Sequence, residues 1–190
     1  MTEILFLSHA SVLIKTSESS IIIDPWLIGS CYWRSWWNYP PVNRELLRDL
    51  DVDAIYLTHV HWDHWHGPSL KKLFKKDTLV ITHDEPNKRS VNDLRQIGFS
   101  NLKLLKHGES LRLGNIKLTP YQFGLFLNDS ALVVETPDIK VLNANDCKIA
   151  GASLRYILKR HGRFDFALRS HSSANDRVCY TLDTGNYSFD

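Results

Sequence analysis

Apolar residues recur at the start of the chain in short runs separated by polar residues. The runs are residues 4–7, 12–14 and 21–23, and the polar segment 17–20 divides the last two. Short apolar runs bounded by turn residues are typical of β-strands. The chain is therefore expected to open with a meander of strands that ends at Asp24 and Pro25.

Further along, apolar positions at helical spacing alternate with continuous apolar runs. The expected helices are 43–50, one beginning near Pro68, 87–97 and 154–160. The expected strands are 54–57, 79–82, 102–105, 111–113, 116–120, 131–135, 140–142 and 164–168. Strands that alternate with helices and then continue as a meander predict an α/β fold.

No linker, repeat or low-complexity segment divides the 190 residues, of which 43% are hydrophobic, so a single domain over residues 1–190 is expected. The N-terminal apolar run meets polar Ser8 and His9 too soon for a signal peptide or a membrane span. Cys31, Cys147 and Cys179 are widely spaced and odd in number, which argues against a secreted disulfide framework. We therefore expect a soluble, cytoplasmic protein.

Charge indicates no macromolecular partner. Lys and Arg total 23 against 21 Asp and Glu, and the two signs are interspersed along the chain. No basic segment therefore predicts nucleic-acid binding. Composition leaves the oligomeric state open.

Residues 58–64 read Thr-His-Val-His-Trp-Asp-His and directly follow the expected strand 54–57. His59 and His61 are two positions apart, so their side chains should project to the same side of an extended loop. Imidazole nitrogens and a carboxylate suit zinc, and also iron or manganese. This segment, called the HxHxDH loop below, predicts a metal site at a strand end.

A catalytic metal keeps a position for water and lowers the pKa of that water towards neutrality, which suits hydrolysis. The neighbours Asp63 and His64 could serve a second metal ion, or Asp63 could deprotonate the attacking water as a general base. Both roles stay open. His66 is expected to be a solvated or capping residue at the start of the next helix.

The HxHxDH loop, with the threonine before it, resembles the THxHxDH motif of the metallo-β-lactamase superfamily. The opening segments 7–14 and 23–27 further resemble the branch containing L-ascorbate-6-phosphate lactonases, N-acyl-phosphatidylethanolamine phospholipases and CMP-N-acetylneuraminate hydroxylases. The resemblance covers most of residues 4–171 and is strong in these motifs. It implies an αββα sandwich, and because domains of this superfamily are usually longer, one shortened at the C-terminus.

The resemblance also implies a set of site residues. The implied metal ligands are His59, His61, Asp63, His64 and Asp146, the last as the carboxylate that bridges two metals. Asp24 would be a buried residue that orients the ligands. His9 would lie near the site, either as a catalytic contact to substrate or as a structural residue. Zinc is expected, as one or two ions, with iron or manganese as alternatives.

The sequence departs from the superfamily at the place of its middle metal histidine. No histidine lies between His107 and His161. His107 itself is expected in a surface turn, and Asp129 or Gln122 could supply the missing ligand. His171 follows an expected strand near the place of the last metal histidine, as a ligand or as part of a surface loop.

Together these patterns predict a metal-dependent hydrolase that uses metal-activated water on an ester, lactone, amide or phosphodiester. The alternatives are an iron-dependent oxygenase on the same fold and a degenerate, non-catalytic binding module. The expected partner is a small-molecule substrate, phosphorylated or otherwise anionic. The candidate anion-binding residues are Arg34, Arg44 and Lys88.

Four of the six tryptophans, Trp26, Trp33, Trp36 and Trp37, lie within twelve residues. Aromatic residues contribute strongly to cores, so a packed aromatic corner is one interpretation. A wall of the substrate pocket is the other. In the binding-module alternative, Trp33, Trp36 and Trp37 would form the surface that meets a partner.

Overall fold

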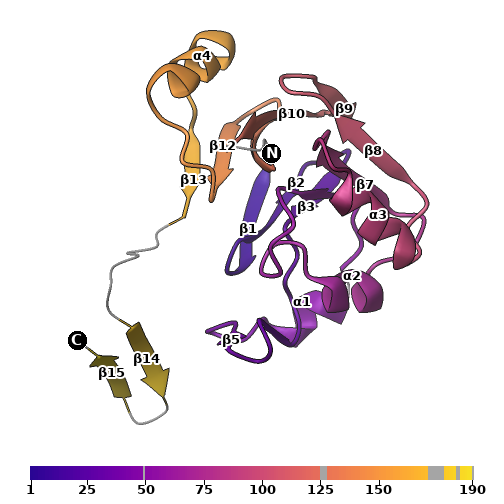
Figure 1. Ribbon diagram of the computed structural model, residues 1–190. Coiled ribbons are helices and arrows are strands. Elements are labelled where there is room, and N and C mark those ends of the chain that lie inside the picture. The colour runs from indigo at the N-terminus through magenta and orange to yellow at the C-terminus, as the bar shows by residue number, and fades with distance from the viewer. Residues whose placement is uncertain (49, 125–127, 171–177, 183–184, 190) are drawn as a thin grey trace.

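The computed structural model describes residues 1–48, 50–124, 128–170, 178–182 and 185–189. Within these ranges the chain forms two larger sheets and four helices, which Figure 1 labels in chain order. In this part of the chain, no helix is long and apolar enough to span a membrane.

The first sheet has six strands in the order β1-β2-β3-β6-β7-β8. These strands are β1 (Glu3–Ser8), β2 (Ser11–Lys15), β3 (Ser20–Ile23), β6 (Ala54–Leu57), β7 (Leu79–His83) and β8 (Leu102–Leu105). The first three form antiparallel pairs, whereas β3, β6, β7 and β8 run parallel. β3, β6 and β7 are buried almost throughout, as expected where both faces of a sheet are covered, whereas the edge strand β8 alternates and exposes Lys103.

The second sheet has five strands in the order β13-β12-β11-β10-β9. These strands are β9 (Leu111–Leu113), β10 (Ile116–Phe123), β11 (Asp129–Glu135), β12 (Lys140–Asn145) and β13 (Phe166–Arg169). All pairs are antiparallel except β12 and β13, which helix α4 (Gly151–His161) connects. The helical crossover permits this parallel pairing.

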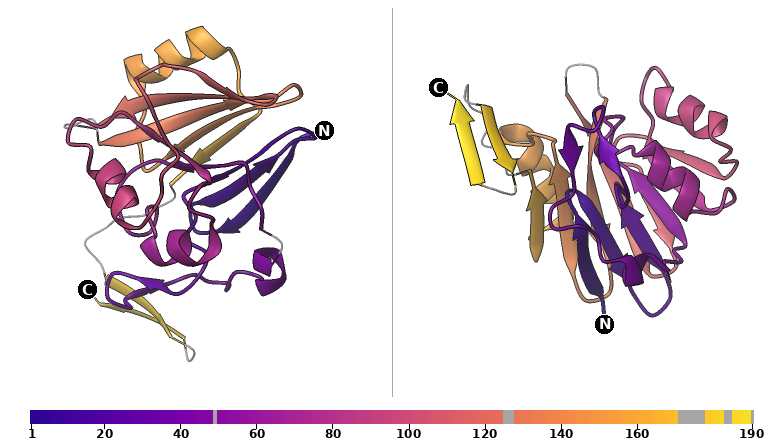
Figure 2. Two further views of the ribbon diagram at one scale, coloured as in Figure 1. Left: turned by 90° about the vertical axis from the view of Figure 1, so that its right-hand side faces the viewer. Right: turned by 90° about the horizontal axis from the view of Figure 1, so that it is seen from below.

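The two sheets pack face to face, with helices on both outer faces (Figures 1 and 2). Side chains such as Ile14, Tyr56 and Leu132 from both sheets fill the space between them. Helices α1 (Arg44–Arg48), α2 (Gly67–Leu73) and α3 (Arg89–Gln96) lie on the first sheet, and α4 packs on the second. The expected α/β fold, an αββα sandwich, is confirmed.

The structure differs from the expected elements at three main places. The helix expected over 43–50 is shorter in the structure, where α1 covers Arg44–Arg48. The tryptophan-rich segment contains the small pair β4 (Ser30–Cys31) and β5 (Trp36–Trp37), and the C-terminal segment forms the hairpin β14 (Val178–Leu182) and β15 (Gly185–Phe189), for which no strands were expected. These strands pair locally and lack the alternating pattern that would have indicated them.

The two sheets are also joined by a polar contact below the HxHxDH loop. The hydroxyl groups of Tyr56 on β6 and Ser130 on β11 lie 2.8 Å apart. Ser130 Oγ also donates to the carbonyl of Thr58, at 2.9 Å. This contact fixes the end of β6 against the second sheet, where the HxHxDH loop begins.

Candidate metal centre

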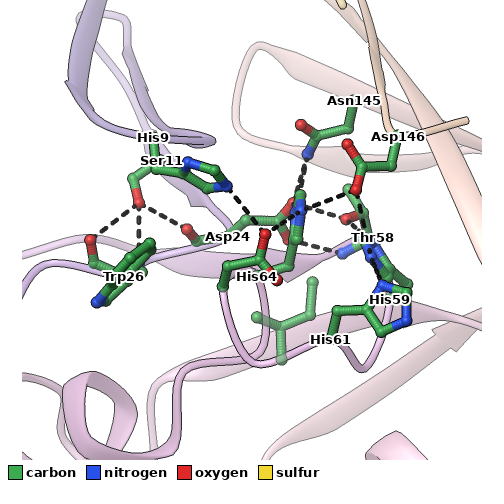
Figure 3. Close-up of polar contacts among 12 residues, drawn as sticks. His9, Ser11, Asp24, Trp26, Thr58, His59, His61, His64, Asn145 and Asp146 are labelled. Carbon is green, nitrogen blue, oxygen red and sulfur yellow. Dashed lines mark hydrogen bonds and ion pairs between the residues drawn. The ribbon is translucent and has the colours of Figure 1, made fainter. Parts of the chain in front are cut away.

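Four strand ends and turns bring the site together. β3 pairs in parallel with β6, so Asp24 and Thr58 follow neighbouring strands at the same edge of the sheet. Asp146 follows β12 of the second sheet, and His9 lies in the turn between β1 and β2. Figure 3 shows these side chains pointing towards one another.

Asp24 is fully buried beneath the predicted ligands. Its carboxylate accepts hydrogen bonds from the backbone N–H of Thr58 (2.8 Å), from Thr58 Oγ1 (2.6 Å) and from Asn145 Nδ2 (2.5 Å). His64 Nδ1 lies 2.8 Å from the same carboxylate. The placement agrees with the buried, orienting role expected for Asp24.

These contacts determine how the imidazoles are presented. If His64 donates from Nδ1 to Asp24, then Nε2 keeps the lone pair that a metal ion needs. Thr58 Oγ1 donates to Asp24 and can therefore accept from His59 Nδ1, which lies 3.0 Å away. His59 would then also present Nε2 as an acceptor.

The structure brings the predicted ligands into two groups that could each hold a metal ion. The first ligand group is His59, His61 and Asp146. His59 Nε2 lies 2.8 Å from His61 Nδ1 and 3.9 Å from Asp146 Oδ2. His59 and His61 therefore point to the same place, as their spacing predicts.

The second ligand group is His9, Asp63 and His64. Asp63 Oδ2 lies 2.9 Å from His9 Nε2 and 3.4 Å from His64 Nε2. Asp146 Oδ2 is also 3.4 Å from His64 Nε2, so this carboxylate lies between the two groups. This is the position that a bridging ligand requires.

Burial and charge set the protonation of the group members. Burial, reinforced by the charge of His64, lowers the pKa of His59 to about 4, so that its imidazole is neutral at pH 7. Burial raises the pKa of Asp63, but contacts with His64, His9 and Tyr32 outweigh burial and hold that pKa far below its usual range. Asp63 is therefore an anion of low basicity, which suits a metal ligand better than a general base.

The surroundings of His64 show whether a metal cation fits this site. Burial lowers the pKa of His64, but Asp24, Asp146 and Asp63 outweigh it and raise the pKa to about 12, so without a metal the ring holds a positive charge. Its Nε2 is nevertheless buried and makes no hydrogen bond within the described residues. Asp63 Oδ2 and Asp146 Oδ2 lie 3.4 Å from it as ion-pair neighbours, so this buried nitrogen has charged neighbours but no hydrogen-bond partner among the described residues. A metal cation among these carboxylates would take the place of the Nε2 proton and bind the nitrogen, and the nitrogen and oxygen donors suit zinc, iron or manganese.

Asp129, one of the residues considered for the missing middle ligand, interacts electrostatically with the site. It starts β11, and its charge acts to raise the pKa of His59. Gln122 instead donates from Nε2 to the carbonyl of Asp84, and His107 is exposed, with Nδ1 accepting from the backbone of Gln122. His171 lies outside the described residues.

Tyr32 is a site residue that the sequence did not indicate. Its hydroxyl donates to Asp63 Oδ1 at 2.6 Å, on the oxygen that His9 leaves free. Its ring stacks on Trp62, with centroids 5.7 Å apart. The one available signal was its place in the tryptophan-rich segment, and no local pattern relates that segment to Asp63.

The tryptophan-rich segment divides between core and surface. Trp26 is buried, whereas Trp33, Trp36 and Trp37 are exposed, so a packed aromatic corner is wrong for these three. Trp36 lines a cavity of about 510 Å³ above the second ligand group, together with Phe6 and Arg169.

The structure also shows where the candidate anion-binding residues and His66 lie. Among the described residues, Arg169 is the one Lys or Arg that lines the cavity, instead of Arg34, Arg44 or Lys88. His66 is buried and caps α2, where its Nδ1 accepts from the backbone N–H of Ser69. The capping interpretation of His66 is therefore confirmed and the solvated one is wrong.

Comparison with known proteins yields one family and related enzymes. A family model described as a beta-lactamase superfamily domain matches residues 3–123. The cytidine monophosphate-N-acetylneuraminic acid hydroxylase of Mus musculus is 28% identical over 151 residues, which cover 76% of this chain and 26% of that protein. The chain thus spans about a quarter of the length of such curated relatives.

Two solved structures share the fold. CmlA, a diiron β-hydroxylase from Streptomyces venezuelae, superimposes with a TM-score of 0.66 at 18% identity, covering 87% of this chain and 34% of that one. An isothiocyanate hydrolase from Delia radicum gut bacteria superimposes with a TM-score of 0.67 at 22% identity, covering 93% and 73%. The fold is thus shared by hydroxylases and hydrolases.

Proposed function

Because this chain belongs to the beta-lactamase superfamily, whose family model covers residues 3–123, we propose that it is a metal-dependent enzyme that hydroxylates a small organic substrate with dioxygen. The single observation that carries the proposal is the composition of the two ligand groups. Each contains two histidines and one carboxylate. Open sites of two histidines and one carboxylate are the typical iron sites of non-haem oxygenases.

The relatives support this choice. The curated relative from Mus musculus is named a hydroxylase, and one of the structural neighbours is a diiron hydroxylase. The carboxylate of Asp146 lies between both groups, and the charge of Asp129, a candidate for the missing ligand, acts on His59. Additional carboxylate in place of imidazole suits hard metal ions such as iron or manganese.

The proposed hydroxylation balances in atoms and electrons. A substrate C–H group, dioxygen, two electrons and two protons give a C–OH group and one water, so an external electron donor is required. Bound iron would supply the activation of dioxygen. The chain would contribute the ligands, the buried carboxylate of Asp24 that orients them, and the cavity that holds the substrate.

The lining of the cavity favours a substrate with an apolar part and an anionic group. Phe6, Val12, Trp36 and Leu168 supply apolar surface beside the second ligand group. Arg169 supplies a positive charge at the same cavity, and Asn143 and Asn145 supply amide groups. A carboxylate or phosphate on the substrate would pair with Arg169.

The test is to load the metal-free protein anaerobically with Fe²⁺, reduce it with dithionite, remove the excess, and add dioxygen. We expect the iron-loaded protein to consume dioxygen and to change its visible absorption, whereas zinc-loaded protein and the iron-treated His61→Ala variant should not. An iron-loaded protein that is inert towards dioxygen would overturn the proposal.

Hydrolysis is the second candidate, because two histidines and one carboxylate also hold catalytic zinc in hydrolases. The structural likeness to an isothiocyanate hydrolase keeps this candidate in view. Zinc-loaded protein would then cleave p-nitrophenyl acetate or bis(p-nitrophenyl) phosphate faster than the His61→Ala variant. Such cleavage, with no dioxygen consumption by the iron form, would select hydrolysis over hydroxylation.

A further inference from the structure

We propose that His9 is a metal ligand, and that it completes the second site with Asp63, His64 and the shared Asp146. This inference rests on the proposed metal-dependent function. His9 lies 54 residues before Asp63 and outside the HxHxDH loop. It was expected from the sequence as a substrate contact or as a structural residue, not as a ligand.

The distances between the donor atoms carry the proposal. Ligand atoms about 2.1 Å from a zinc ion lie about 3.4 Å apart at tetrahedral angles and about 3.0 Å apart at right angles. His64 Nε2 lies 3.4 Å from both Asp63 Oδ2 and Asp146 Oδ2. His9 Nε2 lies 2.9 Å from Asp63 Oδ2 and belongs to the same group of converging donor atoms.

The local backbone holds His9 in this position. Its φ is +37°, in a region where side chains other than glycine are uncommon, and the pairing of β1 with β2 is irregular between Phe6 and Ser8 just before it. Ser8 Oγ donates to the carbonyl of Trp26 at 2.5 Å and so ties the turn to the segment after Asp24. Such strain persists where the surrounding structure maintains it, typically at functional sites.

Aromatic packing fixes the ring itself. The imidazole of His9 packs edge-on against Trp26, with centroids 5.3 Å apart, and against Trp36, with centroids 6.2 Å apart. The His9 side chain is 37% exposed, and its Nε2 lies 2.9 Å from Asp63 Oδ2. An imidazole packed against two tryptophans, with its donor atom close to those of Asp63 and His64, is preorganised for a cation.

His9 could instead act only by holding Asp63 in place, and Tyr32 provides the control for that possibility. Tyr32 donates to the other oxygen of Asp63 at 2.6 Å. A Tyr32→Phe variant therefore removes a contact of Asp63 while all four proposed ligands remain. Loss of an orienting contact weakens metal binding about 10–100-fold, but leaves the number of sites unchanged at saturating metal.

The experiment compares wild type, His9→Gly and Tyr32→Phe by zinc titration calorimetry and elemental analysis, and by the visible spectrum of the cobalt-substituted proteins. Glycine adopts a φ of +37° freely, so His9→Gly should keep the fold, which circular dichroism checks. We expect two metals in wild type and in Tyr32→Phe at saturation. His9→Gly should hold one, and millimolar imidazole should restore the second metal and the cobalt spectrum.

The outcomes separate the ligand role of His9 from the proposed function. If His9→Gly binds two metals with the wild-type cobalt spectrum, the ligand role is wrong while the metal-dependent function stands. If wild type binds no metal, both fail. If His9→Gly and Tyr32→Phe lose metal equally and imidazole restores neither, His9 only positions Asp63 and the proposal is overturned.

Discussion

At the scale of single residues, the site depends on side chains that hold one another. Asp24 orients Thr58 and His64, and Tyr32 and His9 each contact one oxygen of Asp63. Replacing a buried carboxylate that accepts several hydrogen bonds lowers the free energy of unfolding, because its donor groups stay buried and lose their acceptor.

We therefore expect Asp24→Asn to lose both metal affinity and stability. The new amide group would face donors, including the backbone N–H of Thr58, so the free energy of unfolding should fall by about 3 kcal/mol. Zinc affinity should fall about 10–100-fold, because His64 would lose the contact that sets its tautomer. Urea unfolding of the metal-free protein and zinc titration measure the two effects.

Asp53→Asn is the matched control for this change. Asp53 also accepts two hydrogen bonds, from Ser20 N (2.8 Å) and Ser20 Oγ (2.9 Å), but it is exposed and precedes β6, whereas the HxHxDH loop follows the other end of that strand. It should change stability by less than about 1 kcal/mol and leave metal affinity unchanged. Equal effects of the two variants would contradict the orienting role of Asp24.

At the scale of elements, the site forms only where the two sheets are held together. The HxHxDH loop leaves the first sheet after β6, whereas Asp146 leaves the second sheet after β12. The apolar core between the sheets brings these ends within reach of each other. Polar contacts between the sheets then fix the relative position of the two strand ends, because hydrogen bonds are directional and apolar packing is not.

Ser130→Ala should disturb this register. It removes the partner of the buried Tyr56 hydroxyl and the donor to the carbonyl of Thr58. An unsatisfied buried hydroxyl costs about 1–3 kcal/mol, which chemical denaturation would detect. The double variant Tyr56→Phe, Ser130→Ala should recover part of the loss, because the Tyr56 hydroxyl that Ser130→Ala leaves without a partner is then absent. A double variant less stable than the sum of the single changes would contradict this account.

A second polar contact joins β10, β11 and α4. Glu135 Oε2 lies 2.7 Å from Lys117 Nζ and 3.2 Å from His161 Nδ1, and Oε1 lies 3.9 Å from Lys140 Nζ. Burial raises the pKa of Glu135, but the contacts with Lys117 and His161 outweigh it and hold that pKa below the ordinary value of 4.5. Since the pKa is lowered on folding, the carboxylate stabilises the fold above pH 4.5, and this contribution is lost as the pH falls through the folded pKa.

Glu135→Gln should therefore destabilise the metal-free protein by about 1–2 kcal/mol at pH 7. The difference from wild type should shrink below pH 4.5 and approach zero once Glu135 is protonated. Urea unfolding at pH 7, 5 and 3.5 measures the trend, with Glu18→Gln at an exposed turn as the control. A difference that stays constant with pH would contradict the ionic nature of the contact.

At the scale of the whole molecule, a metal that binds only the folded chain stabilises it. The ligand groups draw on both sheets and on residues up to Asp146, so the unfolded chain lacks them as groups. Zinc at 100 times its dissociation constant should add about 2.7 kcal/mol. For a chain of this size that corresponds to a rise of about 5–10 °C in Tm.

Thermal unfolding followed by circular dichroism, with zinc and with EDTA, measures this shift. His61→Ala should lose a large part of the rise, because it removes one nitrogen of the first ligand group. His107→Ala, at an exposed turn, should keep the whole of it. Identical melting temperatures with zinc and with EDTA in wild type would contradict a metal site that forms on folding.

The sequence by itself determined the elements and the central loop. Apolar runs and helical spacing predicted most strands and helices, because their periods are local properties of the chain. The spacing of His59 and His61 after a buried strand predicted two imidazoles pointing to one place, and the structure has them so. The resemblance to a known superfamily is confirmed by the family model over residues 3–123.

Only the tertiary structure decided what surrounds that loop. His9 is 54 residues from Asp63, Tyr32 is 31, and Asn145 is 121 from Asp24. No local period relates positions so far apart, and the packing of the two sheets and the turns at their edges sets the distances. A ligand supplied by the turn between β1 and β2 is thus a property of the folded molecule, because donor atoms converge on a metal only when separate strands end at the same edge.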